Sequence, residues 1–248
     1  MEKRICGHGI LANLAKTPYG AVYLLRAADG RTLLCHQVLL HKVRPAELQA
    51  LEPLVAASQG FKHENLLSCL AAERSSKAWN LLYESFSEQT LAELLEARPL
   101  GWDARLRLMR QVREVVKYLE VKRALHSHFR LRNFLVEERS GAVKAVDAVV
   151  ATLQTLHARA EDVEEFKYWP PEELSGAEAT AKGDVWSVGL VFWQLALGPG
   201  AFPFDARSKE TFLAAVARPP PPAPTPSCSS SPSSTRARWR ATSRSPTS

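Results

Sequence analysis

The fold of this chain is decided by a stretch in its second half, which reads His126-Ser127-His128-Phe129-Arg130-Leu131-Arg132-Asn133. Asp147-Ala148-Val149 and then Asp184-Val185-Trp186-Ser187-Val188-Gly189 follow it along the chain. Two histidines so close together can indicate a metal site, but no cysteine or acidic cluster at ligand spacing accompanies His126 and His128. We therefore interpret both histidines as structural. The last segment lacks the first glycine of a G-x-S-x-G elbow, so it does not predict a hydrolase.

The composition around these segments is that of an ordinary globular protein. Of 248 residues, 46% are hydrophobic and 23% are charged, which excludes disorder over the whole length. The four cysteines are scattered and form no C-x-x-C pair, so they do not indicate a disulfide scaffold. They are Cys6, Cys35, Cys69 and Cys228. We expect a reducing, cytoplasmic setting.

No segment predicts secretion or a membrane span. The N-terminus has no continuous signal-peptide core, and the most apolar segment, Val185 to Leu197, is interrupted by Ser187 and Gln194.

The positive net charge is unevenly distributed. The chain carries +6 formally, from 32 Lys and Arg against 26 Asp and Glu. Residues 219–248 are rich in proline and serine and hold four arginines and no acid, which leaves two net charges for residues 1–218. Such a composition predicts a disordered tail. Because Trp239 is its one aromatic residue, the tail gives little support to nucleic-acid binding.

Strand patterns dominate the first third and helical patterns the remainder. Strands are predicted at 21–26, 32–40, 66–72 and 78–83, with a turn at Asp29-Gly30, and a helix at 45–57 that contains Pro53. A second helix is predicted at 103–119, with Leu106, Met109, Val112, Val116 and Leu119 on its apolar face and Arg105, Arg107, Arg110 and Arg113 on a solvated face. A buried helix is predicted at 185–197. The pattern indicates an α+β fold.

From about Asn13 to Arg218, the ordered set of segments resembles the protein kinase domain, in its tyrosine-kinase-like branch. The residues that carry the resemblance are Ala15 to Tyr23 for the glycine-rich loop, Leu34-Cys35-His36 for the third strand, Pro99 to Leu119 for the helix before the catalytic loop, His126 to Asn133 for that loop, Asp147-Ala148-Val149 for D-F-G, Tyr168 to Glu172 for A-P-E and Asp184 to Gly189 for the central helix. The resemblance implies a two-lobed domain over residues 1–218. It has a β-rich N-lobe over about 1–84 and a helical C-lobe over about 85–218 that lacks the last helices of the family.

At the positions that carry chemistry, the chain departs from the family pattern. His36 replaces the lysine that binds ATP phosphates, and His128 replaces the catalytic aspartate. A histidine is mostly neutral near pH 7 and shorter than lysine, and it cannot supply a carboxylate's charge. The glycine-rich loop keeps only Gly20, with Ala15 and Thr17 in place of glycines. The resemblance therefore implies that no catalytic residue is left.

Other positions keep the family's residue types. Gly20, Val22 and Leu135 match nucleotide-contacting positions, and Asn133 and Asp147 match the two Mg²⁺ ligands. Both polar residues also have a purely structural interpretation, as hydrogen-bond partners of loop backbone. Glu52 is the expected partner of His36. Leu34 is expected to occupy adenine space, Tyr83 to be the gatekeeper before the hinge at 84–86, and Ala148 to remove an aromatic plug. Glu172 and Asp184 are expected to be buried anchors.

These substitutions predict a pseudokinase, a kinase-like domain that acts as a signalling scaffold or allosteric partner of another protein, for example an active kinase. No cofactor is required in this interpretation. The alternative is a weak atypical kinase that binds ATP with Mg²⁺ through Asn133 and Asp147 and phosphorylates Ser, Thr or Tyr of a protein. The tail after Arg218 further suggests a truncated or alternatively read product.

Overall fold

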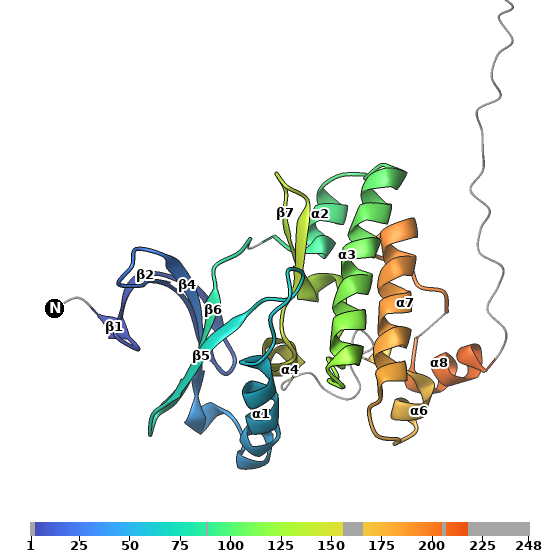
Figure 1. The fold of residues 1–248 in the computed structure, drawn as a ribbon. Coiled ribbons are helices and arrows are strands. Elements are labelled where there is room, and N and C mark those ends of the chain that lie inside the picture. The colour runs from blue at the N-terminus through green and yellow to red at the C-terminus, as the bar shows by residue number, and fades with distance from the viewer. Residues whose placement is uncertain (1–2, 88, 156–165, 205–206, 218–248) are drawn as a thin grey trace, which may run out of the picture.

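The computed structural model describes residues 3–87, 89–155, 166–204 and 207–217. The predicted disordered tail, residues 219–248, lies outside the described residues. Figure 1 shows a curled sheet with one helix beside a group of helices. The predicted α+β fold with a β-rich half and a helical half is confirmed.

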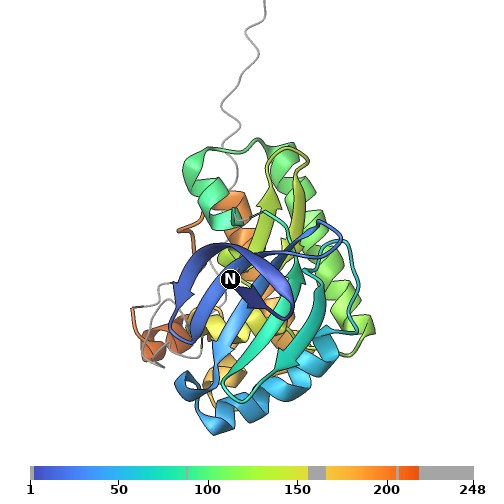
Figure 2. The same ribbon diagram turned by 90° about the vertical axis from the view of Figure 1, so that its left-hand side faces the viewer.

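The N-terminal half is a six-stranded antiparallel sheet in the order β1-β2-β3-β4-β6-β5, and Figure 2 shows how strongly the sheet is curled. Its strands are β1 (Arg4–Ile5), β2 (His8–Thr17), β3 (Gly20–Arg26), β4 (Thr32–Leu39), β5 (Cys69–Arg74) and β6 (Ala78–Glu84). The four predicted strands are all present. The first two strands were not predicted, because β2 mixes glycine, alanine and charge with few β-branched residues.

Gly20 allows β3 and β4 to approach closely. A Cβ atom at this position would lie 1.9 Å from the backbone oxygen of Gln37, and backbone cannot move aside as a flexible side chain can. We expect Gly20→Ala to lower the free energy of unfolding by about 2 kcal/mol or more, as measured by urea denaturation. Gly189→Ala is the control, since nothing lies within 4 Å of its Cβ position. Equal stability of the two variants would contradict the packing at Gly20.

Helix α1 (Pro45–Ser58) packs below the sheet, as the sequence predicted despite Pro53 inside it. Its buried face carries Leu48, Leu51, Val55 and Ser58, and it contacts helix α4 (Ala148–Thr155) of the other half. One hydrophobic core therefore joins α1, α4 and the underside of the sheet.

The helical half contains α2 (Leu91–Ala97), α3 (Trp102–Val121), α4, α6 (Pro171–Leu174), α7 (Ala181–Leu197) and α8 (Lys209–Val216). A two-stranded ribbon of β7 (Phe134–Glu137) and β8 (Ala142–Ala145) lies beside α2 and α3. Short 3₁₀ helices occupy Leu40–Lys42 and Leu131–Asn133. A second core, between α2, α3, α7 and the ribbon, holds this half together.

The predicted faces of α3 were partly wrong. The buried residues are Leu108, Val112, Val115 and Leu119, whereas Leu106, Met109 and Val116 are only half-buried. Arg105 was assigned to the solvated face, but its guanidinium donates hydrogen bonds to the carbonyl oxygens of Leu100 and Leu195, at 2.8 and 3.0 Å. It thus binds the C-terminal end of α7, where unpaired carbonyls attract a cation.

Helix α7 is less buried than its composition predicted. Val188, Val191 and Leu195 are in the core, but Val185 is 62% exposed and Leu197 is 47% exposed. Periodicity could not show this, because the segment is apolar on nearly all sides. Within the described residues, no helix is both long and apolar enough to cross a membrane.

Candidate functional site

The candidate site lies where the sheet meets the helical half. The sheet contributes β4 with His36 and β6 with Tyr83, and the helical half contributes the segment His126 to Asn133 and Asp147 at the start of α4. These are the positions that the sequence assigned to phosphate, base, metal and gatekeeper.

His36 lies in mid-strand, paired with Val22 on β3 and Leu81 on β6. Its ring meets the Tyr83 ring edge to face, with 5.6 Å between centroids. Among the described residues its Nδ1 atom has no hydrogen-bond partner. Desolvation by burial lowers the pKa of His36 to about 4, so its imidazole is neutral at pH 7.

Glu52 is not the partner of His36. It is half-exposed on the outer face of α1 and forms an ion pair with Arg74 of β5. The inner face of α1 presents Leu48, Leu51, Val55 and Ser58 instead. The expected pairing is wrong because α1 is continuous through Pro53 and places Glu52 one position beyond the buried Leu51, on the side of the helix that faces Arg74.

His128 occupies the position of the catalytic base, and its environment keeps it neutral. Its Nδ1 is buried and accepts no hydrogen bond from the described part of the chain. Burial, followed by the charges of His126, Arg130 and Arg132, lowers the pKa of His128 to about 3. An imidazole with such a low pKa is a poor proton acceptor at pH 7.

His126 holds the catalytic-loop backbone, consistent with its structural interpretation. Its ring stacks on Phe129 at 4.1 Å, and its Nδ1 accepts the backbone N–H of His128 at 3.3 Å. Nε2 therefore carries the hydrogen, and this N–H donates a hydrogen bond to the Val146 carbonyl oxygen at 2.7 Å. Asp184 accepts the backbone N–H groups of His126 and Ser127 at 2.8 and 2.7 Å. Asp184 is thus a buried anchor, as expected.

Asp147 is held inside the protein by three hydrogen-bond donors. The Tyr83 hydroxyl donates to it at 2.9 Å, the Val150 N–H at 2.9 Å, and the Ser58 hydroxyl completes the set. The Val150 contact makes Asp147 the cap of α4. Its side chain is 2% exposed, and burial raises its pKa, while the three donors act in the opposite direction.

Asn133 is also turned to the protein. It is fully buried, and its amide donates to the His128 carbonyl at 2.7 Å. This contact matches the structural interpretation of Asn133 as a partner of loop backbone. The Asn133 Oδ1 atom, which would be the metal ligand, has no hydrogen-bond partner among the described residues. The Asp147 oxygens, in contrast, already accept three hydrogen bonds, so the pair as arranged does not fit a Mg²⁺ ion.

Apolar side chains fill the expected nucleotide side of the site. Leu34, Tyr83 and Tyr19 belong to one core cluster with Val149 and Val150 of α4, and Leu135 packs against it. Tyr19 lies in the β2–β3 turn and is 2% exposed. Gly20 is buried and Val22 half-buried on β3. The structure thus brings the predicted nucleotide-contacting region together with residues of the core.

Glu172 is exposed rather than buried, which corrects the sequence expectation. It forms no ion pair with another described residue. Nearby, the buried Arg130 lies over the Tyr168 ring, 5.0 Å from its centroid. The A-P-E segment is thus bound to the catalytic loop through an aromatic contact.

Three important residues had no signal that sequence reasoning could use. Ser58 and the Tyr83 hydroxyl bind Asp147 from 89 and 64 positions away. Tyr19 fills the core from a turn, where an aromatic residue would ordinarily be read as exposed. Only the tertiary fold brings them together.

Comparison with known proteins identifies the family. Residues 12–229 match the family described as protein kinase domain. The rabbit (Oryctolagus cuniculus) cyclin-dependent kinase-like 2 is 28% identical over 210 residues, which cover 79% of this chain and 35% of the relative. The Bacillus subtilis serine/threonine-protein kinase PrkC is 25% identical over 156 residues, 61% of this chain and 24% of the relative.

A solved structure agrees. A crystal structure of Rad53 in complex with AMP-PNP superposes with a TM-score of 0.66 and 17% identity, covering 84% of this chain and 53% of that one. This chain therefore spans about a third of the first curated relative and belongs to the protein kinase domain family.

Proposed function

We propose that this kinase domain has no phosphoryl-transfer activity and acts as a binding partner of another protein. The observation that carries the proposal is the state of Asp147, which caps α4 and accepts from Tyr83 and Ser58. A carboxylate held by three donors inside the core is an element of the fold rather than a metal ligand.

Phosphoryl transfer depends on positioning the nucleotide and stabilising the charge that develops on it. Here the lysine position holds a neutral imidazole with a pKa of about 4, and the base position holds one with a pKa of about 3. Neither supplies the charge that the reaction needs. Loss of a positioned base alone costs about 10²–10⁴ in rate.

The proposed partner is a protein of a signalling assembly, such as an active kinase, and the proposed setting is the cytoplasm. The fold supports this by presenting two rigid halves with a shared core, which keeps surface residues in fixed positions. The proposal does not include nucleic acid.

Titration with ATP tests the proposal. We expect no metal-dependent heat of binding when ATP and Mg²⁺ or Mn²⁺ are added together up to about 1 mM, because the Asp147 oxygens are already hydrogen-bonded. A catalytically active kinase domain in the same buffer is the positive control. Micromolar binding that requires the metal and is lost in Asp147→Asn would favour the weak-kinase alternative instead.

A further inference from the structure

A hollow of about 250 Å³ lies between the C-terminal end of α1 and the C-terminal end of α3. Its apolar lining includes Leu54, Ala57, Phe61, Leu66, Leu119 and Ala124. His126, Asp147 and Ala148 form its inner end. The hollow thus reaches the residues that hold the two halves of the domain together.

The inner end suits an aromatic ring. Phe134, Phe129 and His126 form a continuous stack, with 5.6 and 4.1 Å between successive centroids. The stack ends at His126, which lines the hollow, and the small Ala148 leaves the adjoining space open. An apolar cavity of about 150 Å³ is large enough to bind benzene, so this hollow has room for a phenyl ring and its stem.

The rim of the hollow is basic. Lys122 and Arg123 lie at its mouth and are exposed. Lys122 also lies over the Tyr118 ring, 5.7 Å from the centroid, which holds its ammonium near the mouth. The one carboxylate inside, Asp147, is held by three donors. The unpaired charge around the opening is therefore positive.

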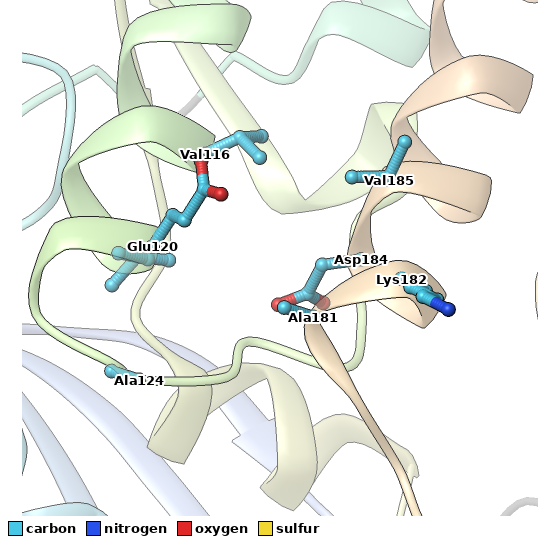
Figure 3. Close-up of a pocket in the computed structure, with 8 residues that line it drawn as sticks. Val116, Glu120, Ala124, Ala181, Lys182, Asp184 and Val185 are labelled. Atoms are coloured by element: carbon cyan, nitrogen blue, oxygen red, sulfur yellow. The ribbon is translucent and has the colours of Figure 1, made fainter.

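A second hollow of about 220 Å³ adjoins the first. It lies between α3 and α7, and both hollows are lined by Leu119 and Ala124. Figure 3 shows it, with Lys182 and Val185 on one side and Glu120 on the other. Asp184 at its floor is bound by two backbone N–H groups. Together the rims carry three exposed cations against one exposed carboxylate, Glu120.

We propose that the first hollow receives an aromatic side chain from an acidic segment of the protein partner. The ring extends the stack that ends at His126, and the flanking carboxylates bind Lys122 and Arg123, with Lys182 further along. The inference rests on the proposed binding function and names the chemistry of its partner.

Three synthetic pentapeptides test this site on the full chain, with binding followed through the NMR methyl signals of Ala57, Ala124 and Ala148. One has phenylalanine between pairs of glutamates, the second has alanine in its centre, and the third has lysines in place of the glutamates. We expect the first to bind at least 10-fold more tightly than either of the others. Free 4-phenylbutyrate should bind more weakly than the first peptide. Equal binding of all the peptides, no binding of the first, or stronger binding of the free acid would overturn the proposal.

Two matched variants locate the binding. Ala57→Trp covers the mouth from the exposed face of α1, and Ala56→Trp adds the same ring at an exposed neighbour that does not line the hollow. We expect the first to reduce affinity at least 10-fold and the second to leave it unchanged. Ala148→Phe, which places a ring inside, should also block the peptide. If both tryptophan variants bind alike, the site is elsewhere. Failure here leaves the proposed function standing, because the nucleotide titration tests that separately.

Discussion

Lowering the pH from 7.5 to 5.0 is expected to reduce the free energy of unfolding by about 2 kcal/mol for each of His36 and His128. Their pKa values in the folded protein are about 4 and about 3, whereas an exposed histidine has a pKa of 6.5. Between pH 6.5 and pH 4, each of these histidines binds a proton in the unfolded chain but not in the folded protein. The stability that these two neutral histidines contribute is therefore fully present above pH 6.5 and is lost as the pH falls towards 4. Asp147 acts in the opposite direction, because burial raises its pKa.

Urea denaturation at both pH values, on the parent and on His36→Leu, isolates the histidine contribution. The variant should lose about 2 kcal/mol less than the parent on acidification. His41→Leu is the matched control, since His41 is exposed. If His36→Leu and His41→Leu show the same dependence on pH as the parent, the imidazole of His36 is protonated in the folded state and the account of the site is wrong.

The order of strands, helices and motifs could be predicted because it depends on local patterns and on a recognisable succession of short segments. The strand predicted at 32–40 from its apolar density is β4 over Thr32–Leu39, and the helix predicted at 45–57 is α1 over Pro45–Ser58, even though Pro53 lies inside it. The position of each motif in the fold follows from the same succession. These properties belong to neighbouring residues, which a sequence displays directly.

The orientation of side chains could not be predicted in the same way. Asp147 matches a metal ligand by position, but its partners Ser58 and Tyr83 come from other elements. Glu52 is next to the residues that face inward on α1, and a difference of one position turns a side chain by about 100° on a helix. Arg105 looked solvated because the end of α7 is 90 positions away.

Asp147→Ala is expected to lower the free energy of unfolding by about 3 to 4 kcal/mol. The change removes the cap of α4 and leaves the Tyr83 and Ser58 hydroxyls without their acceptor in the core. A lost cap costs about 1 kcal/mol and each unsatisfied buried donor about 1–3 kcal/mol, with partial relaxation reducing the sum. Asp103→Ala, on the exposed first turn of α3, should cost less than about 1 kcal/mol.

A double-mutant cycle shows whether the cost arises from the network. Tyr83→Phe should cost about 1 kcal/mol in the parent and should instead stabilise Asp147→Ala by about 1 kcal/mol or more, because it removes the hydroxyl that the loss of Asp147 leaves without an acceptor in the core. A carboxylate available for metal binding would give the opposite pattern: Asp147→Ala would keep the parent's stability, and Tyr83→Phe would cost the same in both backgrounds. The cycle therefore distinguishes an aspartate that holds the two halves of the domain together from one that serves a nucleotide.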